Sequence, residues 1–149
     1  MSFSAEWLAL REPADHRARN QAVRDAALAH LAKLAAPRIV DLGCGSGSNL
    51  RALAPHLPDG QVWRLVDADP LLLDAARAAL KLWADKSEDA DGGALHLWRG
   101  GKRIEVHFEP ADLARDLEAV LDRPADLVTA AAFFDLVAPD WLARFCGAL

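Results

Sequence analysis

The sequence predicts an α/β protein with a doubly wound, mostly parallel sheet, because strand patterns and helix patterns alternate along it. Short apolar runs are followed by stretches in which apolar residues recur every three or four positions. The first run, residues 38–42, leads into a glycine-rich turn. Alternation of this kind is typical of parallel strands that carry helices on both faces of the sheet.

Composition and charge exclude several classes of protein. The 149 residues suffice for one compact domain, and 52% of them are hydrophobic, so a packed core is expected. The net charge of −5, with scattered basic residues, gives no reason to expect duplex nucleic acid as a partner. Residues 1–6 do not begin a signal peptide, the two cysteines make no disulfide framework, and no apolar run approaches the roughly 20 residues of a membrane span. We expect a cytoplasmic protein without a membrane partner.

The first 36 residues are expected to form a helical segment that packs on the same domain as the rest. From about residue 15 onward the pattern is helical, and Pro37 ends it. The expected apolar stripe consists of Val23, Ala27, Leu31 and Leu34. The chain is therefore divided into an N-terminal helical segment, residues 1–36, and an α/β domain, residues 37–149.

Strands are predicted at residues 38–42, 61–67 and 125–132, with a β-hairpin between the last two. The hairpin turns at Gly100-Gly101, and residues 87–93 before it are expected to form a loop. The total is four core strands plus one inserted hairpin strand.

The predicted register of the hairpin sorts its side chains into an apolar and a polar face. Arg99 faces Lys102, Trp98 faces Arg103 and Leu97 faces Ile104. Trp98 and Arg103 are expected to be close enough for a cation–π contact.

Helices are predicted between these strands and at the C-terminus. A brief helix after the glycine turn is expected to end or kink near Pro55. Asp69 is a good N-cap and Pro70 suits the first position of the next helix. Further helices are expected at residues 111–121 and from Pro139 almost to the end of the chain.

The turn after the first strand reads Asp41-x-Gly43-x-Gly45-x-Gly47. Glycines let the backbone approach a ligand, and the following helix presents free N–H groups, so a nucleotide-like ligand is expected here. A dinucleotide fingerprint requires Gly or Ala at the position of Ser48, which argues against NAD.

This stretch closely resembles the first motif of class I S-adenosylmethionine-dependent methyltransferases, which have a Rossmann-like fold. The resemblance implies that Asp41 holds the ammonium group of S-adenosylmethionine, directly or through water. It also implies that the backbone of Gly43, Cys44 and Gly45 lines the methionine end of this cofactor. The alternative is an ordinary tight turn between a strand and a helix.

The resemblance implies further cofactor contacts at the ends of the later strands. Asp67, followed by Ala68, matches the acid that accepts hydrogen bonds from the ribose; the alternative is a solvated loop acid. Asp112 and Leu113 match the pair that contacts adenine, although Asp112 could instead cap a helix.

Three other segments extend the expected site. Thr129 and Ala130 are expected to face the methionine and sulfonium region, and Asp135 either approaches the methyl donor or is structural. Phe133 and Phe134 are expected in the core. Arg11, with Arg19 beyond it, resembles an N-terminal lid that meets the cofactor carboxylate; a surface arginine is the alternative. No metal site is expected, because the five histidines lack ligand spacing.

The resemblance covers only part of the family's seven-stranded domain. The fifth strand, the antiparallel sixth and seventh strands and the acceptor-shaping loops have no counterpart, so the fold is expected to be incomplete. The strand at 125–132 then has a bare apolar edge, which predicts a homodimer through this edge or a fragment of a longer protein.

The expected function is an S-adenosylmethionine-dependent methyltransferase, or its cofactor-binding portion, acting on an unidentified acceptor. No catalytic residue is assigned. The first alternative is a non-catalytic module that binds S-adenosylmethionine or a partner, and the second is a nucleotide-dependent oxidoreductase.

Overall fold

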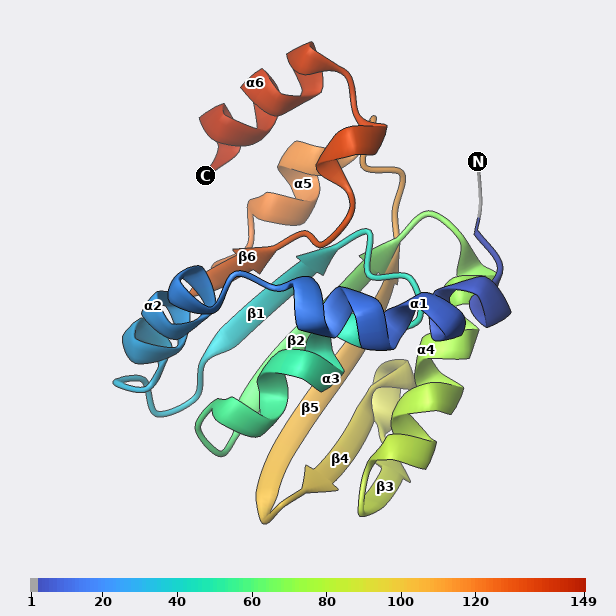
Figure 1. The fold of residues 1–149 in the computed structure, drawn as a ribbon, viewed down its shortest axis with the longest axis vertical. Coiled ribbons are helices and arrows are strands. Elements are labelled where there is room, and N and C mark those ends of the chain that lie inside the picture. Colours follow the sequence, from blue (N-terminus) through green and yellow to red (C-terminus); the bar gives the residue numbers. More distant parts are fainter. Residues whose placement is uncertain (1–2) are drawn as a thin grey trace.

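A six-stranded sheet forms the centre of the computed structural model, which describes residues 3–149 (Figure 1). Met1 and Ser2, part of the expected N-terminal segment, lie outside these residues. The strands are β1 (Arg38–Leu42), β2 (Gln61–Asp67), β3 (Lys86–Asp89), β4 (Leu95–Arg99), β5 (Lys102–Pro110) and β6 (Leu127–Thr129). Their order is β3-β4-β5-β2-β1-β6, in which β5, β2, β1 and β6 are parallel and only β3 and β4 introduce antiparallel pairs. The predicted α/β class and mostly parallel sheet are confirmed.

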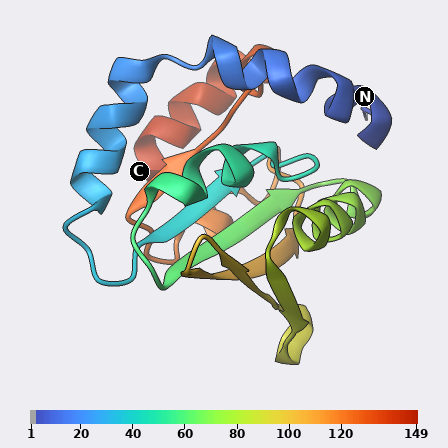
Figure 2. The ribbon, with the colours of Figure 1, turned by 60° about the horizontal axis from the view of Figure 1, so that its bottom comes forward.

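Helices cover both faces of this sheet, and one more crosses its edge. They are α1 (Ala5–Ala18), α2 (Gln21–Leu31), α3 (Ser48–Leu53), α4 (Pro70–Trp83), α5 (Leu117–Leu121) and α6 (Pro139–Ala148), with short 3₁₀ turns η1 (Ala54–His56), η2 (Asp91–Gly93) and η3 (Phe134–Leu136). Figure 2 shows α1 lying across the sheet rather than along a strand. None of the helices within residues 3–149 combines the length and the apolar character needed to cross a membrane.

Two hydrophobic cores result from the alternation of side chains along the central strands. In β1, Ile39 points into the core under α2, α3 and α4, whereas Val40 points into the core under α5 and α6. Leu65 and Val66 of β2 are divided in the same way. Burial on both faces explains why these strands are continuous apolar runs.

A buried polar network fixes the start of β2. The Gln61 side chain donates to the carbonyl oxygens of Ala54 and Pro58, at 3.0 and 3.1 Å, and accepts from Trp63 Nε1 at 2.7 Å. Gln61 and Trp63 are both fully buried. The glutamine therefore ties η1 and the turn after it to the sheet.

The single helix expected over residues 15–36 is wrong. The chain forms two helices, because Asn20 has an extended backbone and its side chain accepts from Val23 N at 3.1 Å, which begins α2. Leu31 of the expected stripe is buried, but Val23 is 69% exposed and Leu28 packs on the core instead.

The loop expected at residues 87–93 is also wrong in its first half, because β3 pairs there with β4. Its polar sequence fits an edge strand, since Asp89 accepts hydrogen bonds from Arg77 and Lys81 of α4. The predicted hairpin register between β4 and β5 is confirmed. The cation over Trp98 is Lys86, 4.7 Å from the ring centroid, and not the predicted Arg103.

Two elements near the C-terminus are shorter than expected. Residues 111–116 form turns, and only residues 117–121 are helical. The last strand covers three residues, and after it Ala132 has a positive φ of 52°. Among residues 3–149 no strand pairs with the outer edge of β6, so the homodimer through this edge stays a prediction.

Replacing Gln61 with leucine is expected to destabilise the fold strongly. The change leaves the Trp63 N–H buried without a partner and removes a hydrogen bond from the carbonyls of Ala54 and Pro58, which costs about 2–4 kcal/mol. Urea unfolding measures the loss. The matched control is Gln21→Leu at the exposed start of α2, which should change stability by less than about 0.5 kcal/mol. Equal losses in both variants would contradict this role of Gln61.

Candidate functional site

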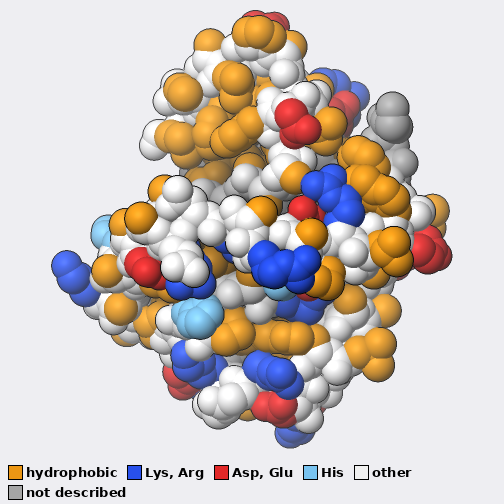
Figure 3. Space-filling model, in the orientation of Figure 1, with side chains coloured by type: hydrophobic (Ala, Val, Ile, Leu, Met, Phe, Trp, Pro, Cys, Tyr) orange, Lys and Arg blue, Asp and Glu red, His pale blue; other side chains and the backbone are white. Residues whose placement is uncertain are grey.

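A cavity of about 1090 Å³ lies where the carboxyl ends of the parallel strands meet. The chain runs from β1 to β2 and β5 on one side and returns to β6 on the other, so the cavity lies beside a topological switch point. Ligands of open α/β sheets bind in such crevices. Figure 3 shows the surface hollowed between α1 and the part formed by α5, η3 and α6.

All but one of the predicted cofactor-binding residues line this cavity. They are Arg11, Asp41, Gly43, Cys44, Gly45, Asp67, Ala68, Asp112 and Leu113. Ala130 packs against the core under α5 and α6, and its neighbours Ala131 and Ala132 line the cavity instead. The strand order thus brings together residues that are up to 102 positions apart in the sequence.

Gly43 and Gly45 have the left-handed backbone that the turn requires, with φ of 64° and 53°. A Cβ atom on Gly43 would lie 2.5 Å from the ring of Phe133, and one on Gly45 would lie 3.1 Å from Leu8. The turn is therefore closely covered by a loop on one side and by α1 on the other. Burial raises the pKa of the Cys44 thiol well above its usual range, which keeps it neutral.

Asp41 is a buried carboxylate at the end of β1. Its Oδ1 accepts from Asn49 Nδ2 at 3.0 Å and from Thr129 Oγ1 at 2.8 Å. Its Oδ2 is buried without a hydrogen-bond partner. Burial raises the pKa of Asp41 to about 6, although the two hydrogen bonds and the charge of Arg19 lower it. A buried acid with one free oxygen can receive a donor from a ligand.

Asp67, at the end of β2, is bonded to the glycine turn. Its Oδ2 accepts from Gly45 N at 2.9 Å and its Oδ1 from Asp69 N at 3.0 Å. Asp69 accepts from Leu71 N and begins α4, so its predicted role as N-cap is confirmed. Asp67 is thus a fixed, half-buried acid at the cavity and not a free loop residue.

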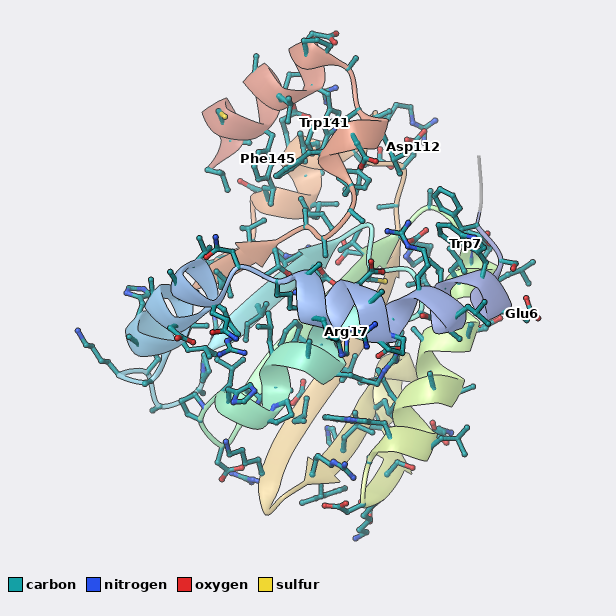
Figure 4. The ribbon with its side chains drawn as sticks, in the orientation of Figure 1. Glu6, Trp7, Arg17, Asp112, Trp141 and Phe145 are labelled. Atoms are coloured by element: carbon teal, nitrogen blue, oxygen red, sulfur yellow. The ribbon has the colours of Figure 1, made fainter. Side chains whose placement is uncertain are left out.

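Asp112 and Leu113 follow β5. Asp112 Oδ1 accepts from Ala114 N at 2.9 Å, so this carboxylate caps a turn while it lines the cavity. The Leu113 carbonyl accepts from Trp141 Nε1 at 2.7 Å, which fixes α6 against this loop. Figure 4 shows Asp112 and Trp141 in the upper part of the molecule and Trp7 on α1 below them.

Two N-terminal arginines line the cavity with different partners. Arg11 binds Asp15 at 3.1 Å and lies over the Trp7 ring, 4.7 Å from its centroid. Arg19 has a buried Nε without a hydrogen-bond partner. Burial lowers the pKa of Arg19, while the charges of nearby acids, Asp41 first, raise it. Arg19 therefore has a buried donor without a partner inside the site.

Polar contacts hold α1 against α3. Arg51 donates to both carboxylate oxygens of Glu12, at 2.9 and 2.6 Å, and His16 Nε2 lies 2.9 Å from Ser48 Oγ. Burial raises the pKa of Glu12, but its bonds with Arg51 outweigh this effect and leave the pKa below its usual value.

Sequence reasoning missed Asn49 and Leu8 as parts of the site and named Arg19 only in passing. Asn49 lies in the first turn of α3, two residues after Gly47, so its position eight residues after Asp41 was the available signal. Leu8 could not be found, because α1 shows no apolar stripe and has no buried residue. Within residues 3–149 no group of three or more His, Cys, Asp or Glu residues could hold a metal ion.

Comparison with known sequences finds partial relatives, and no family model matches the chain. A biotin biosynthesis bifunctional protein, BioCD, of Bordetella avium is 48% identical over 67 residues, which cover 45% of this chain and 14% of that protein. A release factor glutamine methyltransferase of Gloeobacter violaceus is 32% identical over 108 residues, 72% of this chain and 33% of the relative. The chain thus spans a third or less of the length of these two relatives.

Comparison of structures finds the same fold in a methyltransferase. The O-methyltransferase TomG from Streptomyces achromogenes, which is involved in tomaymycin synthesis and was solved with S-adenosylmethionine, aligns with a TM-score of 0.50 at 18% identity. The alignment covers 99% of this chain and 61% of that chain. The likeness shows that the chain has the Rossmann-like fold of a class I methyltransferase.

Replacing Gly43 with alanine is expected to destabilise the protein more than the same change at Gly100. Both glycines have positive φ, 64° and 57°, so both variants lose about 1–2 kcal/mol to backbone strain. Only at Gly43 would the new methyl group meet another side chain, Phe133. We expect a further loss of about 1–3 kcal/mol there, measured by thermal or urea unfolding. Equal losses would show that Phe133 does not pack on the turn.

Proposed function

We propose that this chain, which has the fold of the class I methyltransferases, binds S-adenosylmethionine in the cavity and is a methyltransferase or the cofactor-binding portion of one. Residues 37–149 form the cofactor-binding domain in this proposal, residues 1–36 cover it, and the protein is cytoplasmic. The observation that carries the proposal is that Asp41 Oδ2 and Arg19 Nε, two atoms of oppositely charged side chains, are buried and unsatisfied at the glycine turn, with Asn49 Oδ1 unsatisfied beside them.

An α-amino-acid head group fits this pair of charges. Its ammonium group can donate to Asp41 Oδ2, and its carboxylate can accept from Arg19. Buried polar groups are almost always hydrogen-bonded in native proteins, so two unsatisfied atoms of opposite charge favour a zwitterionic ligand. The methionine end of S-adenosylmethionine has this chemistry. Arg19 therefore replaces Arg11 as the proposed partner of the carboxylate.

The nucleoside end would lie beyond the turn, toward β2 and β5. A carboxylate offers about four acceptor positions, and the two backbone bonds to Asp67 leave room for the two ribose hydroxyls. Ala68 and Leu113 line the cavity next to this acid, and Asp112 would accept from the adenine amino group. The order of strands β5, β2 and β1 matches the order of adenine, ribose and methionine in the ligand.

The reaction would transfer a methyl group to an acceptor heteroatom. A lone pair of the acceptor forms a bond to the methyl carbon, the C–S bond electrons return to sulfur, and the acceptor loses a proton to solvent. The protein contributes position, because the cofactor carries the reactive group. Seven aspartates and three arginines line the cavity, and this excess of carboxylates favours the cationic cofactor over its neutral product.

Calorimetric titration tests the proposal. We expect S-adenosylmethionine and S-adenosylhomocysteine to bind and NAD not to bind. Binding of NAD alone would favour the oxidoreductase alternative, and binding without turnover on any acceptor would favour the non-catalytic module.

The matched variants for this titration are Asp67→Ala and Asp74→Ala. Loss of the Asp67 carboxylate should weaken binding by about 1–3 kcal/mol, whereas exposed Asp74 on α4 lies outside the cavity and should have no effect. Asp67→Asn keeps one acceptor for Gly45 N–H and controls for loosening of the turn. An unchanged dissociation constant in both Asp67 variants would remove Asp67 from the site.

Affinity for S-adenosylmethionine is expected to fall as the pH drops below about 6. Asp41, whose pKa is raised to about 6, must lose its proton to pair with the ammonium group, so binding weakens by up to about tenfold per pH unit below that value. In the unliganded chain the sign is opposite: the stability contribution of Asp41 is present at low pH and is lost as the pH rises through about 6. Calorimetry between pH 5 and 7 measures the affinity. Asp41→Asn should bind weakly at every pH, and a wild-type affinity independent of pH contradicts the assignment.

A further inference from the structure

The cavity holds a second binding region next to the proposed cofactor site. We propose that the methyl acceptor is a small aromatic compound that is neutral or positively charged, bound against Phe133 and Asp135, and that anionic acceptors are excluded. This inference rests on the proposed function, since it concerns the same cavity. It is carried by the size of the cavity, the position of Phe133 and the distribution of charged groups on the walls.

The cavity lies at the upper end of the size range of small-molecule pockets. Pockets for small molecules commonly measure about 300–1,000 Å³, and this one measures about 1090 Å³. The predicted cofactor residues occupy the part at the ends of β1, β2 and β5. The remaining part lies between the segment 131–141 and α1, which leaves space for a second molecule.

Phe133 places this second part beside the reacting end of the proposed cofactor. Its ring packs directly on Gly43, where an added Cβ would lie 2.5 Å away. Ala132, with φ of 52°, bends the chain so that the ring reaches the turn. Non-glycine residues in this conformation are strained, and such strain is found at ligand sites. The acceptor must lie near the methionine end of the cofactor, and Phe133 is the residue that borders both parts.

Apolar side chains form two facing walls of this second part. Phe133, Leu136 and Val137 line one wall, and Leu136 is 56% exposed. Trp7 of α1 lines the other wall, stacked on Phe3 with 4.8 Å between the ring centroids. The half-buried ring of Phe133 and the exposed Leu136 near it fit a flat aromatic molecule, whereas the Trp7 ring already contacts Phe3 and Arg11.

Two of the three arginines that line the cavity are bound to other groups. Arg144 donates to both oxygens of Glu118, at 2.8 and 2.7 Å, and to the carbonyl of Ala114. Arg11 is bound to Asp15, as described above. Arg19 is assigned to the carboxylate of the cofactor. An anionic acceptor would therefore find no free cation among the described lining residues.

Acidic groups, in contrast, are free on this side. The carboxylate of Asp135 makes no hydrogen bond or ion pair with any of residues 3–149, and it lines the cavity between Phe133 and Leu136. Asp140 lies on the same wall and faces Arg144. A carboxylate on the acceptor would lose water next to like charges, which is costly. A hydroxyl or an ammonium group could instead donate to Asp135.

Three phenols that differ only in the charge of the tail test this inference. They are tyramine, which is cationic, 4-(2-hydroxyethyl)phenol, which is neutral, and 3-(4-hydroxyphenyl)propanoate, which is anionic. Binding of each to the 149-residue chain is measured by NMR with S-adenosylhomocysteine at saturation. We expect tyramine and the neutral phenol to bind, and the anion to bind at least about tenfold more weakly than tyramine.

Asp135→Asn should reduce the preference of the protein for tyramine over the anion to about twofold or less while the affinity for S-adenosylhomocysteine stays unchanged. Asp74→Asn, which removes the same charge from the exposed face of α4, should leave the preference as it is. Equal or tighter binding of the anion overturns the inference, as does the absence of binding by all three phenols. If S-adenosylhomocysteine itself does not bind, the proposed function fails and this inference falls with it.

Discussion

The buried carboxylate of Asp41 is the constraint on which the rest of this structure depends. Through Asn49 it joins the end of β1 to α3, and through Thr129 it joins β1 to β6. A buried acid is costly unless its hydrogen bonds are satisfied, so the two donors must keep their positions. They keep α3 next to the glycine turn and β6 next to β1. The start of α3 and the loop after β6 both border the cavity, so these two hydrogen bonds help to hold its walls in place.

The same constraint explains why the site lies at a junction of elements rather than on one of them. Asp67 comes from β2 and holds the turn through Gly45, while Phe133 comes from the loop after β6 and covers Gly43. Each contact crosses between neighbouring strands of the sheet. Binding groups contributed by several strand ends are held by the hydrogen bonds of the sheet itself, which is a rigid support.

The sequence predicted the parts of the fold in which local signals and packing agree. Strand β2 and the hairpin register followed from apolar patterns, and Asp69 followed from capping chemistry. The predictions from the sequence were wrong or silent where tertiary contacts override the local pattern. Strand β3 has a polar sequence because its side chains bind α4, and α1 is helical without an apolar stripe. The unsatisfied atom of Arg19 could be found only in three dimensions.

The contacts that hold α1 in place bear on how a ligand reaches the glycine turn in the cavity. Leu8 lies over Gly45, so α1 covers part of the turn that lines the cavity. This helix has no buried residue, and the ion pair of Glu12 and Arg51 is its principal anchor. Moving it away would expose no fully buried side chain of this helix and would break this ion pair and the contact of His16 with Ser48. A movement of α1 alone would be a local opening, because the sheet beneath keeps its own hydrogen bonds.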